Sequence, residues 1–559
     1  MPTLTCTSEV GPEGLAELRR SRDGLIVERA LDGDEFTLDR GPFRTWHRRL
    51  HVAGVGPARF RVTETIRYHL AIPVWGPLFV LPINSLLRRE HKHRAAARPS
   101  DASGSADRVV PFWAPPDQFD ARASHVLALV CALSLVTGYV STAITQTVTY
   151  AASEFHRSTG DQGAALALVR VGVLIAFVVT AAADQRGRRR LLLVSLYVAC
   201  LTAALGAVAP GLWTLGASQA VAQGFATGGS LLIGVYIAEE VPAGARAWAI
   251  GLLAMATALG AGMCIWVLPL ADLGTAWWRA IYVVPLLGIP FVAWAGRHLP
   301  ETHRFLAHHA AERSARAERG DPAERTGDAP SGDGAGSADT RRPAARRDPR
   351  RRISASQAHR RRFWLLAIGS FGIALFVAPM FQLQNNFLRH ERHFSAAKIS
   401  LYTILTSTPG GIGILVGGWL ADVRGRRIVA ATGMLGGSLL AVAVLFAHGW
   451  PMWGISMVGS VVAAVAVPAF GVYGPELFPT LLRGRVNGLL QVVTVAGSSA
   501  GLLVAGWLTD TFDRFGPAMS VLLVGPLLVA VLVAVAYPET SGRHLEDLNP
   551  EDRVAESGM

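Results

Sequence analysis

The stretch Asp184-Gln-Arg-Gly187-Arg188-Arg189 recurs 238 residues later as Asp422-Val-Arg-Gly425-Arg426-Arg427. Two more charged motifs repeat in the same order and at nearly the same spacing. They are Glu239-x-x-Pro242-x-x-x-Arg246 with Glu476-x-x-Pro479-x-x-x-Arg483, and Leu299-Pro300-Glu301-Thr302 with Tyr537-Pro538-Glu539-Thr540. Apolar stretches of helix length separate the motifs in both copies. Such a repeat is typical of two homologous helical halves that pack together in a bilayer.

The composition favours a membrane protein with polar appendages. The chain has 559 residues, of which 51% are hydrophobic, and its mean hydropathy is positive. Each apolar stretch after Ala123 is long enough to cross about 30 Å of hydrocarbon. We predict an all-α membrane protein with twelve spans in two pseudo-symmetric six-helix halves. The spans are expected near 124–150, 163–183, 191–209, 212–238, 246–270, 279–297, 363–388, 397–421, 428–448, 451–475, 485–509 and 516–536.

These spans divide the chain into five parts. The two bundles are expected at 121–298 and 363–540, with a cytosolic tail at 541–559. Residues 299–362 join the bundles and contain few large apolar side chains, so this segment cannot offset the entropy of ordering and we expect a disordered cytosolic linker. The region 1–120 is polar at its start and lacks the apolar core of a signal peptide, so we expect no cleaved leader.

The net charge of +12 is concentrated in loops on one side of the predicted membrane. The positive-inside rule places these loops and both termini in the cytosol of a multi-pass plasma-membrane protein. Nucleic acid binding is disfavoured because the arginines lie beside spans rather than along one soluble face. The four cysteines lack metal-ligand or disulfide spacing, and there is no nucleophile elbow or phosphate-binding loop. We therefore expect no enzyme activity, no metal and no cofactor.

The first 120 residues pose a separate problem. Leu25–Leu31, Phe43–Ala53 and Ala58–Ala71 are rich enough in β-formers to predict strands, and an apolar segment broken by three prolines follows them. Those prolines disfavour a thirteenth span. The stretch Leu70–Arg89 is similar to the strand-to-helix ending of START-like, polyketide-cyclase-type domains, in which a curved sheet grips a long helix. The favoured alternative is a small β-rich collar whose helix lies on the inner membrane surface.

The repeated Asp-x-x-Gly-Arg-Arg turns must join two spans within very few residues. Glycine allows the tight reversal, and the arginines after it can satisfy helix carbonyls and contact headgroups. An aspartate at the end of a span can face the positive N-terminus of a neighbouring helix and pair with an arginine. This would form a latch that one conformation makes and another breaks. The alternative is that the charges only hold loops and orient the chain.

With these motifs, the segment from Ala123 to Leu548 resembles the major facilitator superfamily. The Glu-x-x-Pro-x-x-x-Arg pairs and the endings that begin at Pro300 and Pro538 are similar to those of its sugar-porter branch and its metabolite and organic-ion branches. The resemblance implies alternating access, in which two six-helix halves rock about a central site. It also implies a gating network at the inner face. The expected gating residues are Asp184, Gly187, Arg188, Arg189, Glu239, Arg246, Glu301, Arg304, Asp422, Gly425, Arg426, Arg427, Glu476, Arg483, Glu539 and Arg543.

Polar side chains inside spans are costly in lipid unless they face a wet cavity or a partner. They recur at helical spacing on the first, fourth and eleventh spans, and amides gather at the end of the seventh. We predict that these residues line one cavity and contact a solute, with interhelical hydrogen bonding as the alternative for serines and threonines. The candidate substrate residues are Gln146, Arg170, Gln219, Gln223, Gln384, Asn385, Tyr473 and Gln491.

Arg170 is the most informative of these residues. It lies 14 positions before Asp184, about 21 Å along a helix, which places it in the outer half of the membrane. An unpaired charge there costs up to ~3 kcal/mol. Its counterpart at the 238-residue spacing is Thr408, so the repeated scaffold does not need an arginine. We predict that Arg170 faces the cavity and attracts an anionic group, with snorkelling toward the outer headgroups as the alternative.

The sequence therefore predicts a secondary active transporter of a small organic solute, such as a carboxylate or a sugar-like metabolite. The alternatives are an exporter of amphiphilic compounds and a non-transporting membrane sensor with a lipid-binding N-terminal module. The expected partners are the solute and membrane lipids. A proton can be the coupling ion only if Glu239, Glu240 or Glu476 is desolvated in a closed state, which would raise its pKa. No nucleic acid partner is expected, and the chain is expected to act as a monomer.

Overall fold

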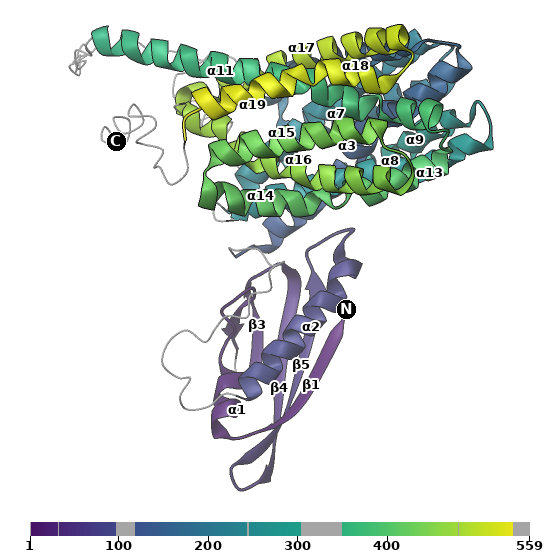
Figure 1. The fold of residues 1–559 in the computed structure, drawn as a ribbon. Coiled ribbons are helices and arrows are strands. Elements are labelled where there is room, and N and C mark those ends of the chain that lie inside the picture. The colour runs from purple at the N-terminus through teal and green to yellow at the C-terminus, as the bar shows by residue number, and fades with distance from the viewer. Residues whose placement is uncertain are drawn as a thin grey trace, which may run out of the picture.

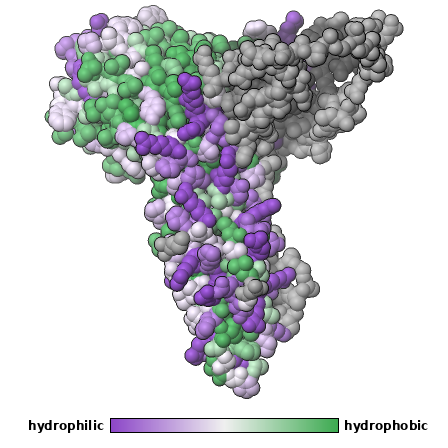
Figure 2. Space-filling model, turned by 180° about the vertical axis from the view of Figure 1, so that it is seen from behind, coloured by the Kyte–Doolittle hydropathy of each residue, from purple (hydrophilic) through white to green (hydrophobic). Residues whose placement is uncertain are grey.

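The computed structural model describes residues 2–31, 33–96, 118–242, 245–302, 349–478 and 480–539. It describes the backbone alone at 184–186, 238, 246–247, 349–358, 415, 418, 422, 471–472, 474–476 and 480–485. Figure 1 shows a helical bundle and a smaller domain made from the first strands and helices of the chain. Figure 2 shows that apolar residues dominate the surface of the bundle, whereas hydrophilic residues are frequent on the small domain.

The small domain is a five-stranded antiparallel sheet with a long helix packed against it (Figure 1). The strand order is β1-β5-β4-β3-β2, so the first strand pairs with the last. The elements are β1 (Thr3–Val10), α1 (Pro12–Arg19), β2 (Val27–Ala30), β3 (Glu35–Arg40), β4 (Phe43–Gly56), β5 (Arg59–Leu70) and α2 (Gly76–Ala95). Alternate residues of β5 point to one face, where Ile66, Tyr68 and Leu70 are buried with Ile83 and Leu87 of α2.

Three of these strands, β2, β4 and β5, lie where the sequence predicts strands. The sequence does not predict β1, β3 or α1. In β1 the residues that face the helix are Leu4, Cys6, Ser8 and Val10. Because two of these four are not strongly apolar, the sequence shows no clear alternation of apolar and polar residues. The predicted β-rich region is confirmed, and its sheet is open. A long helix held against a sheet is also the arrangement that the START-like ending implies.

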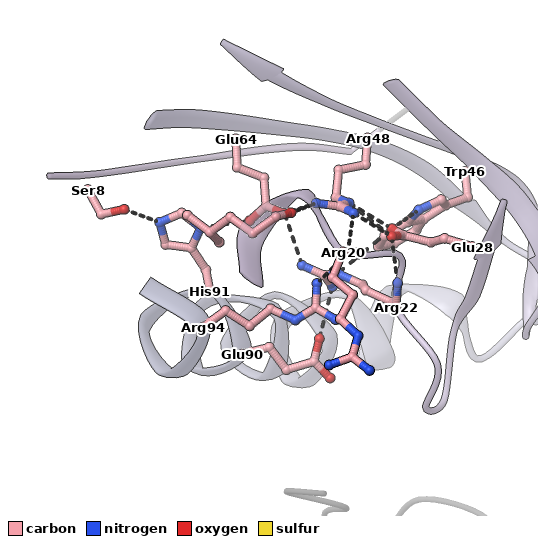
Figure 3. A network of polar contacts seen from close by, with 11 residues as sticks. Ser8, Arg20, Arg22, Glu28, Trp46, Arg48, Glu64, Glu90, His91 and Arg94 are labelled. Carbon is pink, nitrogen blue, oxygen red and sulfur yellow. Dashed lines mark hydrogen bonds and ion pairs between the residues drawn. The ribbon is translucent and has the colours of Figure 1, made fainter. Parts of the chain in front are cut away.

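Charged side chains fill part of the contact between the sheet and α2 (Figure 3). Glu28 accepts hydrogen bonds from the guanidinium of Arg48 at 2.7–3.0 Å. Glu64 accepts from Arg22 at 3.2 Å and from Nδ1 of His91 at 2.7 Å. All five side chains are buried. Buried charges are tolerated only when each is paired and hydrogen-bonded. Because His91 of α2 must meet Glu64 of the sheet, the network fixes which face of α2 packs against the sheet.

The first half of the bundle contains six spans. They are α3 (Ala121–Glu154), α4 (Thr159–Gly172) with α5 (Ile175–Arg186), α6 (Arg188–Ala204) with η2 (Leu205–Val208), α7 (Leu212–Glu240), α8 (Arg246–Val267) with η4 (Leu268–Leu273), and η5 (Trp277–Arg279) with α9 (Ala280–His298).

The second half repeats this arrangement. Its spans are α11 (Pro349–Gln382) with α12 (Gln384–Asn386) and η6 (Phe387–Glu391), α13 (Ala396–Ser407) with α14 (Gly410–Arg424), α15 (Arg426–Phe446), α16 (Gly449–Leu477), α17 (Thr480–Phe512), and α18 (Phe515–Leu522) with α19 (Val524–Ala536). Among the described residues, 12 helices are long and apolar enough to cross a membrane, which confirms the predicted fold class.

The equivalent spans of the two halves share a local break. The second span is interrupted between α4 and α5, and the eighth is interrupted between α13 and α14, next to Pro409. Proline removes a backbone donor and ends a regular helix, which explains the second break. Arg170 and Thr408, which the repeat relates, both lie beside these breaks.

The start of the seventh span differs from the prediction. α11 begins at Pro349, so residues 349–362, which the sequence assigns to the linker, are helical. The arginine-rich stretch has no apolar periodicity, so its sequence pattern gives no helix signal. Most of the predicted linker, residues 303–348, lies outside the described residues, as does the predicted tail.

Candidate functional site

The two repeated turns define one end of the bundle, called here the arginine-turn end. Gly187 has φ +93° and ψ 134°, and Gly425 has φ +98° and ψ 139°. Residues other than glycine rarely adopt this backbone conformation. The two glycines therefore permit the sharp reversal between spans. The helices α6 and α15 begin directly after these glycines.

The Pro-Glu-Thr motifs supply the caps for these two helices. Glu301 accepts a hydrogen bond from the backbone N–H of Arg189 at 3.1 Å. Glu539 accepts from the backbone N–H groups of Arg426 at 2.9 Å and Arg427 at 3.2 Å. A carboxylate at a helix N-terminus satisfies unpaired donors and complements the helix dipole. The repeated glutamates therefore hold the turns of their own halves.

The arginines of the turns bind carbonyls at the ends of neighbouring helices, as the sequence predicts. Arg189 donates to the carbonyl of Gly296 at 2.6 and 3.2 Å. Arg427 donates to the carbonyl of Ala534. Both residues of the second contact lie 238 positions after those of the first. Each contact ties the third span of a half to its sixth.

Among the described side chains of the first half, two ion pairs lie at the same end. Arg188 pairs with Glu239. Arg122 pairs with Glu240 at 3.1 Å and also donates to the carbonyl of Glu301 at 3.1 Å. These contacts show that α3 begins at the arginine-turn end. The structure describes only the backbone of Asp184, Arg246, Asp422, Glu476 and Arg483, whereas Arg304 and Arg543 lie outside the described residues.

At the opposite end of the bundle, two aspartates each accept hydrogen bonds from backbone N–H groups of the other half. Asp510, near the end of α17, accepts from the backbone N–H groups of Thr159 at 3.0 Å and Gly160 at 2.7 Å. These donors open α4 in the first half. The crossing carboxylate therefore stabilises a helix N-terminus in the other half.

Asp272 makes the equivalent contact in the other direction, from the first half to the second. It lies at the end of the fifth span and accepts from the N–H groups of Ala396 at 2.8 Å and Ala397 at 2.9 Å, which open α13 in the second half. Asp272 and Asp510 are separated by 238 residues. Sequence reasoning missed both aspartates, although the repeat spacing relates them. We call these two contacts the crossed caps.

Two asparagines add polar contacts between the halves near the crossed caps. The side-chain amide of Asn385 donates to Oε1 of Gln146 at 2.9 Å and to its backbone carbonyl at 3.0 Å. Asn386 donates to Oε1 of Gln162 at 3.0 Å. The structure thus brings together two of the predicted substrate residues, Gln146 and Asn385, and they bind each other.

Close backbone packing accompanies these bonds. A Cβ atom on Gly163 of α4 would collide with the carbonyl of Leu502 of α17, and one on Gly506 would meet the backbone of Gly160. Small residues allow helices to approach at backbone distance. The two halves are therefore in tight contact at the end opposite the arginine turns.

Arg170 lies between the halves, at the end of α4. Its guanidinium faces the side chain of Gln382 in α11, whose amide oxygen, when turned toward it, accepts from Nε at 2.5 Å. Among the described residues, no carboxylate pairs with Arg170, which is half-buried. Its only described partner is therefore a neutral amide from the opposite half.

Among the described residues, no hydrogen bond joins Arg170 to the other predicted substrate residues. Gln219 is buried and donates to the carbonyl of Ala203 in its own half at 3.1 Å. Tyr473 is buried with its ring 5.2 Å from that of Tyr537. Gln223 and Gln384 are half-buried, and Gln491 is exposed on α17.

An apolar pocket of about 390 Å³ also lies between the halves. It is lined by Phe177 of α5 and by Gly488, Leu489 and Val492 of α17. Phe177 lies ten residues before the turn glycine Gly187, so the pocket is nearer to the arginine-turn end than the crossed caps are.

Residues 129–386 and 365–555 match the family model described as Major Facilitator Superfamily. None of the curated proteins matches the chain. Solved structures show the same fold at low sequence identity.

Three of these structures show the range. A bacterial homolog to the human lysosomal transporter Spinster, inward-facing and unoccupied, has a TM-score of 0.57 at 13% identity, over 77% of this chain and 98% of that one. The xylose transporter XylE from E. coli, inward open, has a TM-score of 0.57 at 17% identity, over 77% and 99%. The nucleoside transporter NupG, as a D323A mutant, has a TM-score of 0.57 at 10% identity, over 74% and 100%.

Proposed function

The chain belongs to the major facilitator superfamily, and we propose that it is a secondary active transporter that moves a small organic anion across the plasma membrane by alternating access. The observation that carries this proposal is the placement of Arg170 between two halves that the crossed caps join at one end. A transporter of this kind needs a site between its halves that opens to one side at a time.

The positive-inside rule supports an orientation for this state. The arginine-rich turns belong in the cytosol, so the crossed caps lie at the outer face. The outer end is then closed by hydrogen bonds between the halves, and the site opens toward the cytosol. The Spinster homolog and XylE structures compared above are in inward-facing and inward-open states.

Arg170 supports an anionic substrate. A guanidinium inside a membrane protein is costly unless it is paired, and an amide compensates it less well than a carboxylate does. A solute carboxylate in the space between α4 and α11 would complete the charge pair. Because Gln382 belongs to the other half, the same solute would contact both halves and could couple binding to their movement.

Counterflow in proteoliposomes tests this function. We expect exchange of a labelled carboxylate from a panel of aliphatic acids, aromatic acids, sugars and organic cations, assayed with and without a pH gradient. The gradient arm tests the proton as coupling ion. A protein that binds label without exchanging it would be a sensor, and exchange confined to amphiphilic cations would favour an exporter of such compounds.

Arg170→Gln tests the site. Losing a charge-assisted contact costs about 1.5–3 kcal/mol, so we expect the KM for the carboxylate to rise roughly 10- to 100-fold. Arg170→Lys keeps the charge and should retain part of the affinity. Arg190→Gln is the matched control, because this exposed arginine follows the turn at the far side of the membrane. An unchanged KM in folded Arg170→Gln protein would overturn the anionic site.

A further inference from the structure

The helix α2 of the small domain has two distinct faces. Its buried face includes Ile83, Leu86, Leu87 and His91, and the network of Figure 3 holds this face against the sheet through the bond between His91 and Glu64. The opposite face is exposed and follows helical spacing. It consists of Leu78, Leu81, Ser85, Arg88, Arg89 and Lys92, here called the outer face of α2.

The outer face changes character along the helix. Leu78 and Leu81 are 67% and 78% exposed, and Val74, directly before the helix, is exposed as well. The second part carries Arg88, Arg89 and Lys92. An exposed apolar turn can enter the acyl chains, while basic side chains farther along the same face can contact anionic headgroups.

The small domain contacts the bundle next to this apolar turn (Figure 1). Nε1 of Trp75 donates to the backbone carbonyl of Ala128 in α3 at 3.0 Å, and the Trp75 ring packs against the core of the first half. Arg44 and His125 form a second contact at 3.1 Å. The start of α2 is therefore held beside a membrane-spanning helix.

The length of α3 gives the depth of this contact. Its 34 residues make about 51 Å of helix, whereas the hydrocarbon core is about 30 Å thick. If the excess is shared between the two ends, about 7 residues lie outside the core at each end. Ala128 is seven residues after Ala121, so Trp75 lies at the boundary between headgroups and acyl chains. Tryptophan is enriched at this boundary.

We propose that the outer face of α2 is a lipid-binding surface that lies on the membrane leaflet at the arginine-turn end. Val74, Leu78 and Leu81 enter the acyl chains beside α3, and Arg88, Arg89 and Lys92 contact anionic headgroups. The charges match, since anionic lipids attract clusters of basic side chains at the cytosolic surface. This role is separate from the proposed transport. The outer face of α2 anchors the small domain to the bilayer and makes the position of that domain sensitive to lipid composition.

Site-specific quenching in proteoliposomes tests this proposal. The full chain would carry Leu81→Cys, labelled with an environment-sensitive fluorophore, in a Cys6→Ser background. The background suffices because the other three cysteines are buried. Val55→Cys is the matched control, since Val55 is an exposed apolar residue in the β4–β5 hairpin, away from α2. Vesicles would contain phosphatidylcholine with or without phosphatidylglycerol.

We expect nitroxides on lipid acyl chains to quench the label at position 81 several-fold more than the label at position 55. Aqueous iodide should show the reverse order. Arg88→Glu combined with Arg89→Glu should raise iodide access at position 81 only in vesicles that contain phosphatidylglycerol. The control pair Arg59→Glu and Arg67→Glu, on exposed strand positions, should not do so.

Equal iodide access at positions 81 and 55 would overturn the proposal, and it is also the result expected if this face binds another protein. If the Arg59→Glu and Arg67→Glu pair raised iodide access at position 81 as much as the Arg88→Glu and Arg89→Glu pair does, the proposed contact of Arg88 and Arg89 with anionic headgroups would be wrong. The readout requires no solute, so a failure here is distinct from a failure of the proposed transport.

Discussion

Glu64 shows how a single buried charge stabilises the small domain. It accepts hydrogen bonds from His91 and Arg22 and is enclosed between β5 and α2. Burial alone would raise the pKa of its carboxyl. The hydrogen bond from His91 and the charges of Arg22 and Arg48 outweigh burial and lower the pKa from 4.5 to about 2.

This lowered pKa predicts a pH dependence with a definite sign. A carboxyl whose pKa is lower in the folded than in the unfolded domain stabilises the fold above the unfolded pKa. The stabilisation, on the order of 3 kcal/mol, should be lost as the pH falls from about 4.5 toward 2. Hydrogen exchange of β5 amides in the full chain, corrected for intrinsic rates, would measure the loss of protection.

Glu64→Gln is the informative variant for this prediction. It removes the titrating group and one of the carboxylates that pair with Arg22 and Arg48, so the domain should be less stable at neutral pH and should lose less protection on acidification. If wild type and Glu64→Gln lost protection over the same pH range to the same degree, Glu64 would not be the group responsible.

Single residues also mark the limit of what the sequence predicts. The repeat singled out Glu301 and Glu539, and the resemblance implied that they belong to a salt-bridge network. In the structure they accept from backbone N–H groups at the starts of α6 and α15. Sequence spacing can relate equivalent residues, but the choice between a side-chain and a backbone partner depends on how closely the chains approach. At Gly425 a Cβ would lie 2.8 Å from Glu539.

At the scale of elements, the crossed caps join helices of different halves. Asp510 binds the start of α4, and Asp272 binds the start of α13. Each cap is exposed, so we assign it about 1 kcal/mol, the usual worth of a helix cap. Losing both should favour separation of the halves at this end by roughly 30-fold, about 2 kcal/mol.

Spin-label distances would measure that separation. Trp213→Cys and Trp450→Cys place labels at the starts of α7 and α16, in equivalent positions of the two halves at the end of the crossed caps. In the Cys6→Ser background we expect one short distance. Asp272→Asn with Asp510→Asn should add a population at longer distance, and each single variant should have a smaller effect.

Asp513→Asn is the control for these variants, because it makes the same chemical change three residues after Asp510. It should leave the distance distribution as in wild type. A distribution that stays short in the double variant would show that apolar packing, rather than the caps, holds this end together.

The elements themselves were largely predictable, and the exceptions have physical reasons. Apolar length predicts the twelve spans, because a membrane helix must match the thickness of the bilayer. The start of α11 at Pro349 was missed because arginine-rich residues give no apolar signal. Asp272 and Asp510 obey the same 238-residue spacing as the motifs, but their partners lie in the other half and follow only from tertiary packing.

At the scale of the whole molecule, the contacts that the described residues make differ between the two ends. At the arginine-turn end, Glu301 and Glu539 each hold a turn within their own half. At the other end, the crossed caps and the bond from Asn385 to Gln146 join the halves. Hydrogen bonds made between the halves must break when that end opens, whereas bonds within a half can persist through a rigid-body movement. The distribution of contacts therefore suits two halves that rock about a central site.

This asymmetry predicts the side from which the pocket between α5 and α17 is reached. Val492 lines the pocket and lies 18 residues before Asp510, about 27 Å along α17 from the crossed caps. Val492→Cys in the Cys6→Ser background should react with a membrane-impermeant maleimide at least tenfold faster in inside-out than in right-side-out vesicles. Adding Asp272→Asn and Asp510→Asn should raise the right-side-out rate, because loss of the caps populates the state that opens outward. Equal rates on the two sides without these substitutions would mean that the crossed caps do not close the pathway.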